Sequence, residues 1–251
     1  MKARKRFGQN FLHDPQLIAK IISAINPRQD DRIVEVGPGR GAITMPLVDS
    51  KCDLTVIEID RDLAAQLRHL YPNTKLIEAD VLKFDFAELG EGIRVVGNLP
   101  YNISTPLMFK LFEHYHRIID MHFMLQLEVV ERLVAVPNSE HYGRLSIMSQ
   151  YYCDAQLLFK VPPEAFIPQP KVTSAIVRLQ PKQERTLATN ETRFANLVNQ
   201  AFSMRRKTLR NALKGFVTAE DLEHLDIDPM RRPETLSLDD FIHIANIDTK
   251  Q

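Results

Sequence analysis

The chain has 251 residues, of which 44% are hydrophobic and 25% charged, and its 32 basic side chains balance 32 acidic ones. This length suggests one or two domains at about 150 residues per domain, and the composition excludes disordered, collagen-like and low-complexity proteins. The two cysteines, Cys52 and Cys153, lie far apart and outside any metal-binding motif, which predicts a reducing, cytoplasmic environment and no metal site.

The first predicted element is a helix near residues 14–25. From residue 32 to about 126, short β-rich runs alternate with helical patterns, which is typical of βαβ units on a parallel sheet. The predicted strands are 32–36, 54–59, 75–79, 93–96 and 121–125, and the helices between them are 41–49, 61–70 and 105–115. The most apolar stretch, residues 118–136, contains four charged side chains, so no membrane span is expected.

The later elements predict an edge to the sheet and then a second domain. Helices at 128–136 and 145–151 precede strands at 156–161 and 173–179, which we expect to pair antiparallel and close one sheet edge. Residues 181–184 indicate a linker, because only helical periodicity continues beyond them. We therefore predict an α/β domain over residues 1–181 and a helical domain over 182–251, with helical spacing over 191–214 and a short helix at 235–246.

A glycine-rich turn follows the first predicted strand. In residues 34–41, Gly37 and Gly39 lie between the strand and a helix N-terminus, where a ligand can approach the backbone and its free N–H groups. The GxGxG spacing departs from the GxGxxG that binds a pyrophosphate, so it favours a nucleoside with an uncharged tail. A tight turn without a ligand is the alternative.

Polar residues also end the next three predicted strands. Glu58 lies 21 residues after Gly37, where a carboxylate accepts hydrogen bonds from ribose hydroxyls and repels the extra phosphate of NADP, leaving NAD or S-adenosylmethionine (SAM) open. Asp80 offers an acceptor for an adenine amine, and Asn98 ends the fourth strand. Because open α/β sheets bind ligands at the carboxyl ends of their strands, this coincidence predicts a nucleoside site.

The loop Asn98, Leu99, Pro100, Tyr101 is the candidate reactive segment. The Asn98 side-chain oxygen and the Pro100 carbonyl could accept both N–H bonds of an adenine amine and aim its lone pair at a sulfonium methyl group. Tyr101 could stack on the base, a contact worth about 1–3 kcal/mol. A sulfonium leaving group needs no strong general base, which fits the absence of His and Lys from this loop.

Four long motifs, at residues 6–12, 35–41, 98–106 and 166–172, follow one another along nearly the whole chain. Together they resemble the ribosomal RNA adenine N6-dimethyltransferase family, most closely its bacterial 16S branch. The resemblance implies a Rossmann-like SAM-dependent methyltransferase fold, with a mostly parallel seven-stranded sheet and an antiparallel edge, plus a small all-helical C-terminal domain that binds RNA. Leu127 stands where relatives commonly carry Lys, so no RNA contact is assigned to it.

The resemblance also implies site roles and a product. Donor contacts fall on Asn10, Leu12, Gly37, Glu58, Asp80 and Asn98. Phe166 would form the second face of an adenine sandwich opposite Tyr101. The expected product is two adjacent dimethyladenosines in the 3′-terminal hairpin loop of 16S RNA, made by a monomer acting on the immature small ribosomal subunit.

The net charge of zero conceals two basic blocks, +4 over residues 1–20 and +6 over 193–214, while residues 218–248 carry −7. Arg206, Arg210 and Lys214 are spaced to lie on one helix face, which suits phosphate contacts, although a solvated face is the alternative. The predicted RNA-binding residues are Arg4, Lys5, Arg6, Arg205, Arg206, Lys207, Arg210 and Lys214. The rival functions are an N6-adenine methyltransferase of 23S RNA or DNA, a Rossmann dehydrogenase and a non-catalytic assembly factor.

Overall fold

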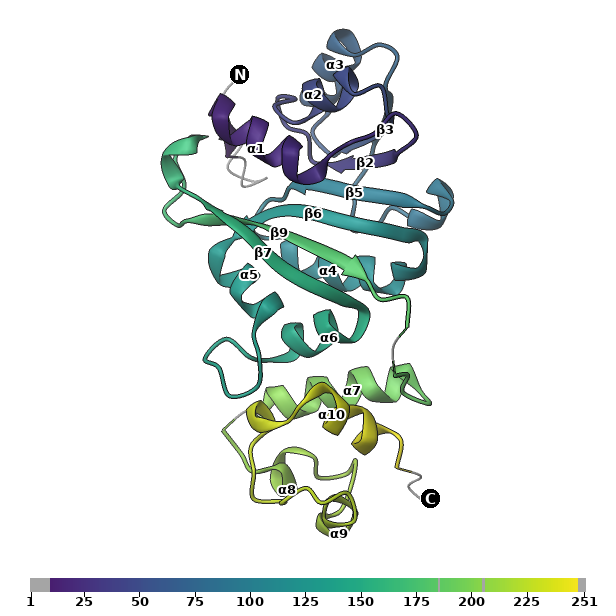
Figure 1. Cartoon of the computed structure of the whole chain (residues 1–251), viewed down its shortest axis with the longest axis vertical. Helices are drawn as coiled ribbons and strands as arrows, with labels where there is room; N and C mark the ends of the chain where they lie inside the picture. The colour runs from purple at the N-terminus through teal and green to yellow at the C-terminus, as the bar shows by residue number, and fades with distance from the viewer. Residues whose placement is uncertain (1–9, 185, 205, 248–251) are drawn as a thin grey trace. The chain divides into compact units, whose positions relative to one another are not determined.

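The computed structural model describes residues 10–184, 186–204 and 206–247, and over these residues seven strands form one sheet in the order β4-β3-β2-β5-β6-β9-β7 (Figure 1). Their bounds are β2 Arg32–Val36, β3 Asp53–Glu58, β4 Lys75–Glu78, β5 Ile93–Asn98, β6 Ile118–Gln126, β7 Cys153–Val161 and β9 Ser174–Pro181. Strands β2 to β6 run parallel and β9 is antiparallel to β6. The predicted mostly parallel sheet with an antiparallel edge is confirmed.

The helices agree closely with the predicted segments. The longer ones are α1 Pro15–Ile25, α2 Thr44–Asp49, α3 Arg61–Leu70, α4 Ser104–Glu113, α5 Leu127–Val134, α6 Arg144–Tyr152, α7 Glu191–Ser203 and α10 Leu238–Ala245, and α8 Leu209–Ala212 and α9 Ala219–Glu223 are short. Helix α2 begins three residues later than predicted because Gly41 has φ +85°, outside the helical region. Among the described residues, every helix is too short or too polar to cross a bilayer.

One face of the sheet is covered by α1 and α2. Ile21 and Ile25 of α1 and Leu47 of α2 join Val56 and Val96 of the sheet in one apolar cluster. Strand β2 is buried from its second residue to its last, which is expected when helices cover both faces of a parallel sheet.

A second, two-stranded sheet brings the N-terminal segment to a distant loop. Strand β1, Phe11–Leu12, pairs antiparallel with β8, Phe166–Ile167. The backbone N–H of His13 extends the contact by donating to the Ala165 carbonyl oxygen at 3.0 Å. The sequence pattern did not predict this pairing, because two-residue strands carry no periodicity.

The chain divides into two compact units. The first contains residues 1–130 and 154–181, and the second contains 131–153 and 182–251. The second unit therefore includes α6 as well as α7 to α10; the Tyr151 hydroxyl, for example, lies 3.1 Å from Glu191 Oε1 of α7. The functional division at residues 181/182, catalytic before and RNA-binding after, stays a prediction.

The helix expected across residues 191–214 is wrong in its second half. Helix α7 ends at Ser203, and α8 begins only at Leu209. The reason is tertiary: the first N–H groups of α8, on Leu209 and Arg210, donate to the carbonyl oxygens of Arg231 and Pro229 instead of continuing α7. Arg206, Arg210 and Lys214 consequently do not share one continuous helix face.

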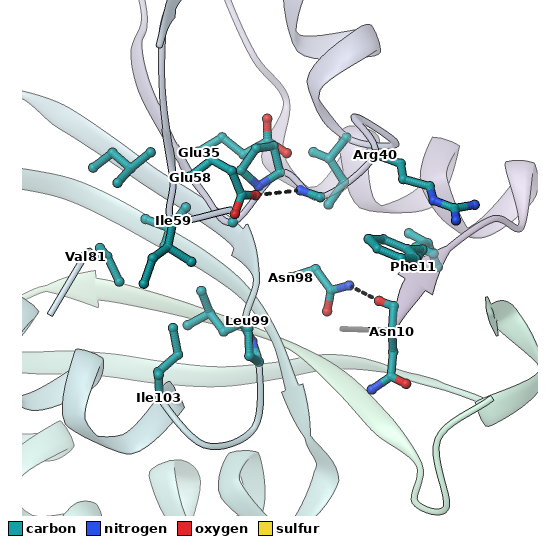
Figure 2. Close-up of a pocket in the computed structure, with 18 of the residues that line it drawn as sticks. Asn10, Phe11, Glu35, Arg40, Glu58, Ile59, Val81, Asn98, Leu99 and Ile103 are labelled. Carbon is teal, nitrogen blue, oxygen red and sulfur yellow. Dashed lines mark hydrogen bonds between the residues drawn. The ribbon is translucent and has the colours of Figure 1, made fainter. Parts of the chain in front are cut away.

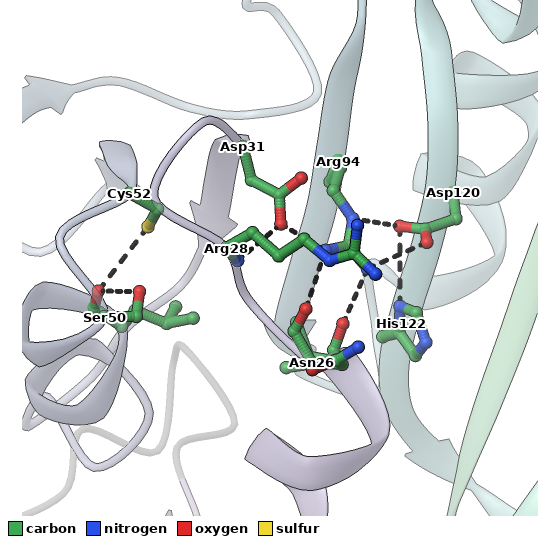
Figure 3. A network of polar contacts seen from close by, with 10 residues as sticks. Asn26, Arg28, Asp31, Ser50, Cys52, Arg94, Asp120 and His122 are labelled. Carbon is green, nitrogen blue, oxygen red and sulfur yellow. Dashed lines mark hydrogen bonds and ion pairs between the residues drawn. The ribbon is translucent and has the colours of Figure 1, made fainter.

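A buried charge network joins the amino ends of the central strands (Figure 3). Arg94 of β5 donates to Asp31 Oδ2 at 2.6 Å and to both carboxylate oxygens of Asp120 at 3.0 and 2.9 Å. It also donates to backbone carbonyl oxygens at the end of α1. Arg94 thereby connects α1, the loop before β2, and strands β5 and β6.

Charge pairing keeps this network ionised. Burial alone would raise the pKa of Asp120, but its contacts with His122 and Arg94 outweigh burial and lower that pKa to about 2. His122 Nδ1 lies 3.6 Å from Asp120 Oδ1, too far for a hydrogen bond, so we attribute the lowering chiefly to Arg94. Burial likewise opposes the Arg94 charge, yet the Asp120 and Asp31 carboxylates raise the pKa of Arg94.

Candidate active site

A cavity of about 290 Å³ opens where β2, β3, β4 and β5 end. It is lined by the loops that follow these strands, by the N-terminal segment and by Phe166, all within the first unit. The structure brings every predicted donor residue to this cavity, together with the whole candidate reactive loop: Asn10, Leu12, Gly37, Gly39, Glu58, Asp80, Asn98, Leu99, Pro100, Tyr101 and Phe166. The role of each residue there stays a prediction.

Two glycines allow the backbone segments at this edge to approach one another. Gly39 has φ +60°, and a Cβ there would lie 3.2 Å from the Phe11 ring. A Cβ on Gly97 would lie 2.5 Å from the Val36 carbonyl oxygen, closer than any side chain tolerates. The ends of β2 and β5 therefore require glycine at position 97, which the sequence motif alone did not reveal.

Glu58 ties the end of β3 to the glycine turn. Its Oε1 accepts from the Asp60 N–H at 2.8 Å and its Oε2 from the Gly39 N–H at 3.3 Å. Burial raises the pKa of Glu58 in spite of these two bonds. Each carboxylate oxygen keeps a second lone pair, so the group retains acceptor capacity toward the cavity.

The loop after β4 is held from two sides. Asp80 Oδ1 accepts from the Leu82 N–H at 3.0 Å, which fixes the turn. Lys110 of α4 donates to the Leu82 carbonyl oxygen at 2.9 Å. Asp80 thus uses one carboxylate oxygen for its own loop and keeps its second oxygen as a further acceptor.

Asn98 is oriented by the N-terminal segment. Its Nδ2 donates to the Asn10 carbonyl oxygen at 3.1 Å, so the carboxamide oxygen is directed away from Asn10 (Figure 2). This assignment of oxygen and nitrogen follows from the hydrogen bond, because a carbonyl accepts only from the amide nitrogen. The second expected acceptor, the Pro100 carbonyl, already accepts from the Ile103 N–H at 3.1 Å and keeps one further lone pair.

The cavity is apolar on one side and polar on the other. Figure 2 shows Ile59, Val81, Leu99 and Ile103 gathered on one side, with Asn10, Phe11, Arg40 and Asn98 on the other. The Arg40 guanidinium lies 4.5 Å from the centre of the Phe11 ring, a cation–π contact. An elongated ligand with an apolar ring at one end and a polar tail at the other matches this division.

Phe166 is more enclosed than a surface aromatic. Only 3% of the residue is exposed, because β8 pairs it with Leu12 of β1 and it packs into the apolar cluster beneath α1. A Phe followed by two prolines is typical of a rigid surface loop that holds an aromatic, with a core Phe at an edge strand as the alternative. In the structure Phe166 is the buried first residue of β8, whose second residue, Ile167, is exposed. Phe166 also lines the cavity.

The four predicted RNA-binding residues that the structure describes lie outside the cavity lining. Arg206, Lys207, Arg210 and Lys214 are exposed in the second unit. Arg4, Lys5, Arg6 and Arg205 lie outside the described residues. Among the described residues, no group of His, Cys, Asp and Glu side chains could hold a metal ion.

Glu35 is a cavity residue that sequence reasoning did not single out. It is 2% exposed, and its Oε2 accepts from the Thr44 hydroxyl at 2.7 Å. Burial raises the pKa of Glu35 to about 7, with the Thr44 hydrogen bond opposing the shift and the Glu58 charge adding to it. The sequence signal for Glu35 was a carboxylate inside an otherwise apolar β-strand pattern. Its position in the motif did not show whether the side chain is buried or exposed to solvent.

Comparison with known proteins decides the family. Residues 1–250 match the family model described as ribosomal RNA adenine dimethylase. This chain belongs to the ribosomal RNA adenine dimethylase family. It is accordingly an rRNA adenine dimethyltransferase, and the predicted methyltransferase fold, family and enzyme class are confirmed.

Proteins similar to this chain carry names that describe rRNA methylation or dimethyladenosine transfer. The ribosomal RNA small subunit methyltransferase A of Acinetobacter baylyi is 53% identical over 98% of this chain and 92% of its own length. The protein of the same name from Tolumonas auensis is 55% identical over 98% of this chain and 94% of its own length. Among solved structures, a dimethyladenosine transferase from Plasmodium falciparum has a TM-score of 0.81 and 30% identity, covering 93% of this chain and 95% of its own. The structure of the 23S rRNA methyltransferase ErmE has a TM-score of 0.72 and 27% identity, and the match covers 94% of this chain and 98% of the ErmE chain.

The raised pKa of Glu35 predicts a pH-dependent stability difference. In the unfolded chain Glu35 ionises near its ordinary pKa of 4.5, whereas in the fold it stays protonated up to about 7. The folded state therefore holds the extra proton, and wild-type stability relative to Glu35→Gln should fall by about 3 kcal/mol as pH rises from 4.5 to 7. Urea unfolding at intervals between pH 4 and pH 8 measures the difference.

The matched control is Glu78→Gln, which removes a surface carboxylate at the end of β4 that pairs with Arg61 and Arg68. Exposed pairs contribute about 0–1 kcal/mol, so this variant should follow the wild-type pH profile closely. Parallel profiles for wild type and Glu35→Gln would show that Glu35 titrates normally in the fold.

Proposed function

We propose that this chain transfers methyl groups from SAM to the N6 amines of two adjacent adenosines in the 3′-terminal hairpin loop of 16S ribosomal RNA. The observation that carries the proposal is the orientation of Asn98. One N–H of its amide nitrogen donates to the Asn10 carbonyl oxygen, which orients the carboxamide so that its oxygen can accept a hydrogen bond from a ligand. An acceptor at this point suits an amine substrate.

The cavity residues fit a SAM donor. Ile59, Val81 and Ile103 offer apolar surface for an adenine ring, and Asp80 offers an acceptor for its amine. Glu58 suits ribose hydroxyls, and its negative charge disfavours a phosphorylated ribose. The glycine turn and the segment Asn10 to Leu12 remain for the amino acid tail, as the family resemblance implies.

Asn98 and Pro100 would orient the acceptor amine. The Asn98 Oδ1 and the second lone pair of the Pro100 carbonyl accept its two N–H bonds, which turns the nitrogen lone pair out of conjugation with the ring. Tyr101 stacks on one face of the base and Phe166 borders the other. The donor would supply a methyl group on a sulfonium and leave as a neutral thioether, so the amine proton can depart after transfer and positioning supplies the catalysis.

The choice of the small subunit rests on the relatives. Proteins named for small-subunit rRNA are 53–55% identical to this chain, whereas ErmE, named for 23S rRNA, is 27% identical. We propose the immature small subunit as the substrate particle, with Arg206, Lys207, Arg210 and Lys214 among its phosphate contacts. We propose further that the protein acts as a monomer in the cytoplasm.

The central test is Asn98→Ala. Removing one preorganised hydrogen-bonding group from an active site typically costs about 100- to 1,000-fold in rate, and we expect a loss of this size in methyl transfer to unmethylated small subunits. Binding of S-adenosylhomocysteine, measured by calorimetry, should fall far less than the rate.

Asn73→Ala is the matched control, because Asn73 is exposed in the turn after α3. It should methylate at the wild-type rate. Mapping of the modified nucleotides identifies the target adenosines. Full activity of Asn98→Ala, or methylation by the wild type of 23S RNA in preference to small subunits, would contradict the proposal.

A second prediction concerns RNA binding by the basic residues around α8. In the double variant Arg210→Ala with Lys214→Ala, each lost phosphate contact should reduce the slope of log affinity against log salt by about 0.7–0.9. Filter binding of small subunits between low and moderate salt measures this slope.

Arg232→Ala is the control, because Arg232 is exposed in the same unit within the acidic segment. It should leave the slope unchanged. S-adenosylhomocysteine should bind both variants as it binds the wild type. An unchanged slope in the double variant would remove these two residues from the RNA contact.

A further inference from the structure

The ring of Tyr101 is connected to a part of the sheet that lies outside the cavity lining. Its hydroxyl is 3.1 Å from the hydroxyl oxygen of Ser174, the first residue of β9. Ser174 is 1% exposed, so its hydroxyl has little access to water. The two residues are 73 positions apart in the chain, and neither the glycine turn nor the reactive loop points to this contact.

Ser174 is held rigidly. It pairs with Gln126 in the antiparallel register of β6 and β9, and the neighbouring Thr173 carbonyl oxygen accepts from the Leu127 N–H at 3.0 Å. Strand β6 is itself paired with β5, the strand that carries Asn98. The Ser174 hydroxyl therefore has a fixed position relative to the end of β5.

Tyr101, in contrast, lies in a loop and is only half-buried. Its carbonyl oxygen accepts from the Ser104 hydroxyl at 3.0 Å. The remaining freedom is rotation of the side chain. A hydrogen bond at the far end of the ring restricts rotation about the Cα–Cβ bond, because the long axis of the ring is then held at both ends.

We propose that Ser174 is a positioning residue for methyl transfer, which holds the Tyr101 ring at the place where the target adenine stacks. The inference rests on the proposed function, in which Tyr101 is the stacking partner. A ring that is already held in place loses little side-chain conformational entropy when RNA binds. It also sets the position of the adenine amine relative to Asn98. The effect should appear in reaction with RNA and not in binding of the donor.

A double-mutant cycle tests the proposal. Ser174→Ala and Tyr101→Phe each remove one hydroxyl of the pair, and the cycle is completed by the double variant. Each single change should lower kcat/KM for unmethylated small subunits by about three- to tenfold, the effect expected of one hydrogen bond. The double variant should be no slower than the slower single variant. Calorimetric affinity for S-adenosylhomocysteine should stay within about twofold of wild type in all three.

Ser149→Ala is the matched control. Ser149 is fully buried in α6, and among the described residues its hydroxyl has no hydrogen-bond partner. Its removal should leave kcat/KM at the wild-type value. Tyr101→Phe removes the same contact at the less buried partner, so the proposal remains testable if Ser174→Ala folds poorly.

The outcomes separate this inference from the proposed function. If the wild-type enzyme fails to methylate small subunits, the proposed function fails. If the wild type methylates but the two single losses multiply in the double variant, Ser174 does not act through Tyr101. If S-adenosylhomocysteine affinity falls in step with kcat/KM, Ser174 merely supports the fold, and the inference is overturned.

Discussion

The site depends on one constraint, that parallel strands joined by right-handed crossovers end at the same edge of the sheet. Strands β2, β3, β4 and β5 run parallel, so their four following loops converge although up to about sixty residues separate them in the chain. Gly97 shows how close the convergence is, since any side chain there would collide with the carbonyl oxygen of Val36. Residues with no local relation to one another thereby form one cavity.

The opposite end of the same strands carries the buried charge network. Arg94 lies near the start of β5, and Asn98 is the last residue of that strand. Asp120 lies near the start of β6, and β5 pairs with β6 in one register from Arg94, opposite Asp120, to Asn98. A buried ion pair adds little net stability over apolar packing, but it is costly to break. We infer that the network fixes the alignment of β5 and β6, and with it the position of the reactive loop at the other end.

Local patterns were sufficient to predict the strands of the seven-stranded sheet and the residues at the ends of β2 to β5. A strand's apolar run and the polar residue that ends it are adjacent in sequence, so Gly37, Glu58, Asp80 and Asn98 could be placed together before the structure was known. The contacts that orient these groups could not be predicted from local patterns. The Asn98 contact with Asn10 spans 88 positions and the Tyr101 contact with Ser174 spans 73, and periodicity carries no information over such separations. For the same reason, the end of α7 at Ser203 depends on a distant loop.

The most direct measurement is a crystal structure of the chain bound to S-adenosylhomocysteine. The account predicts that the adenine lies among Ile59, Val81 and Ile103, that the ribose hydroxyls bond to Glu58, and that the sulfur faces the Asn98 side-chain oxygen across the space reserved for the target amine. A ligand whose sulfur lies remote from Asn98, or whose amino acid tail avoids the glycine turn, would contradict it.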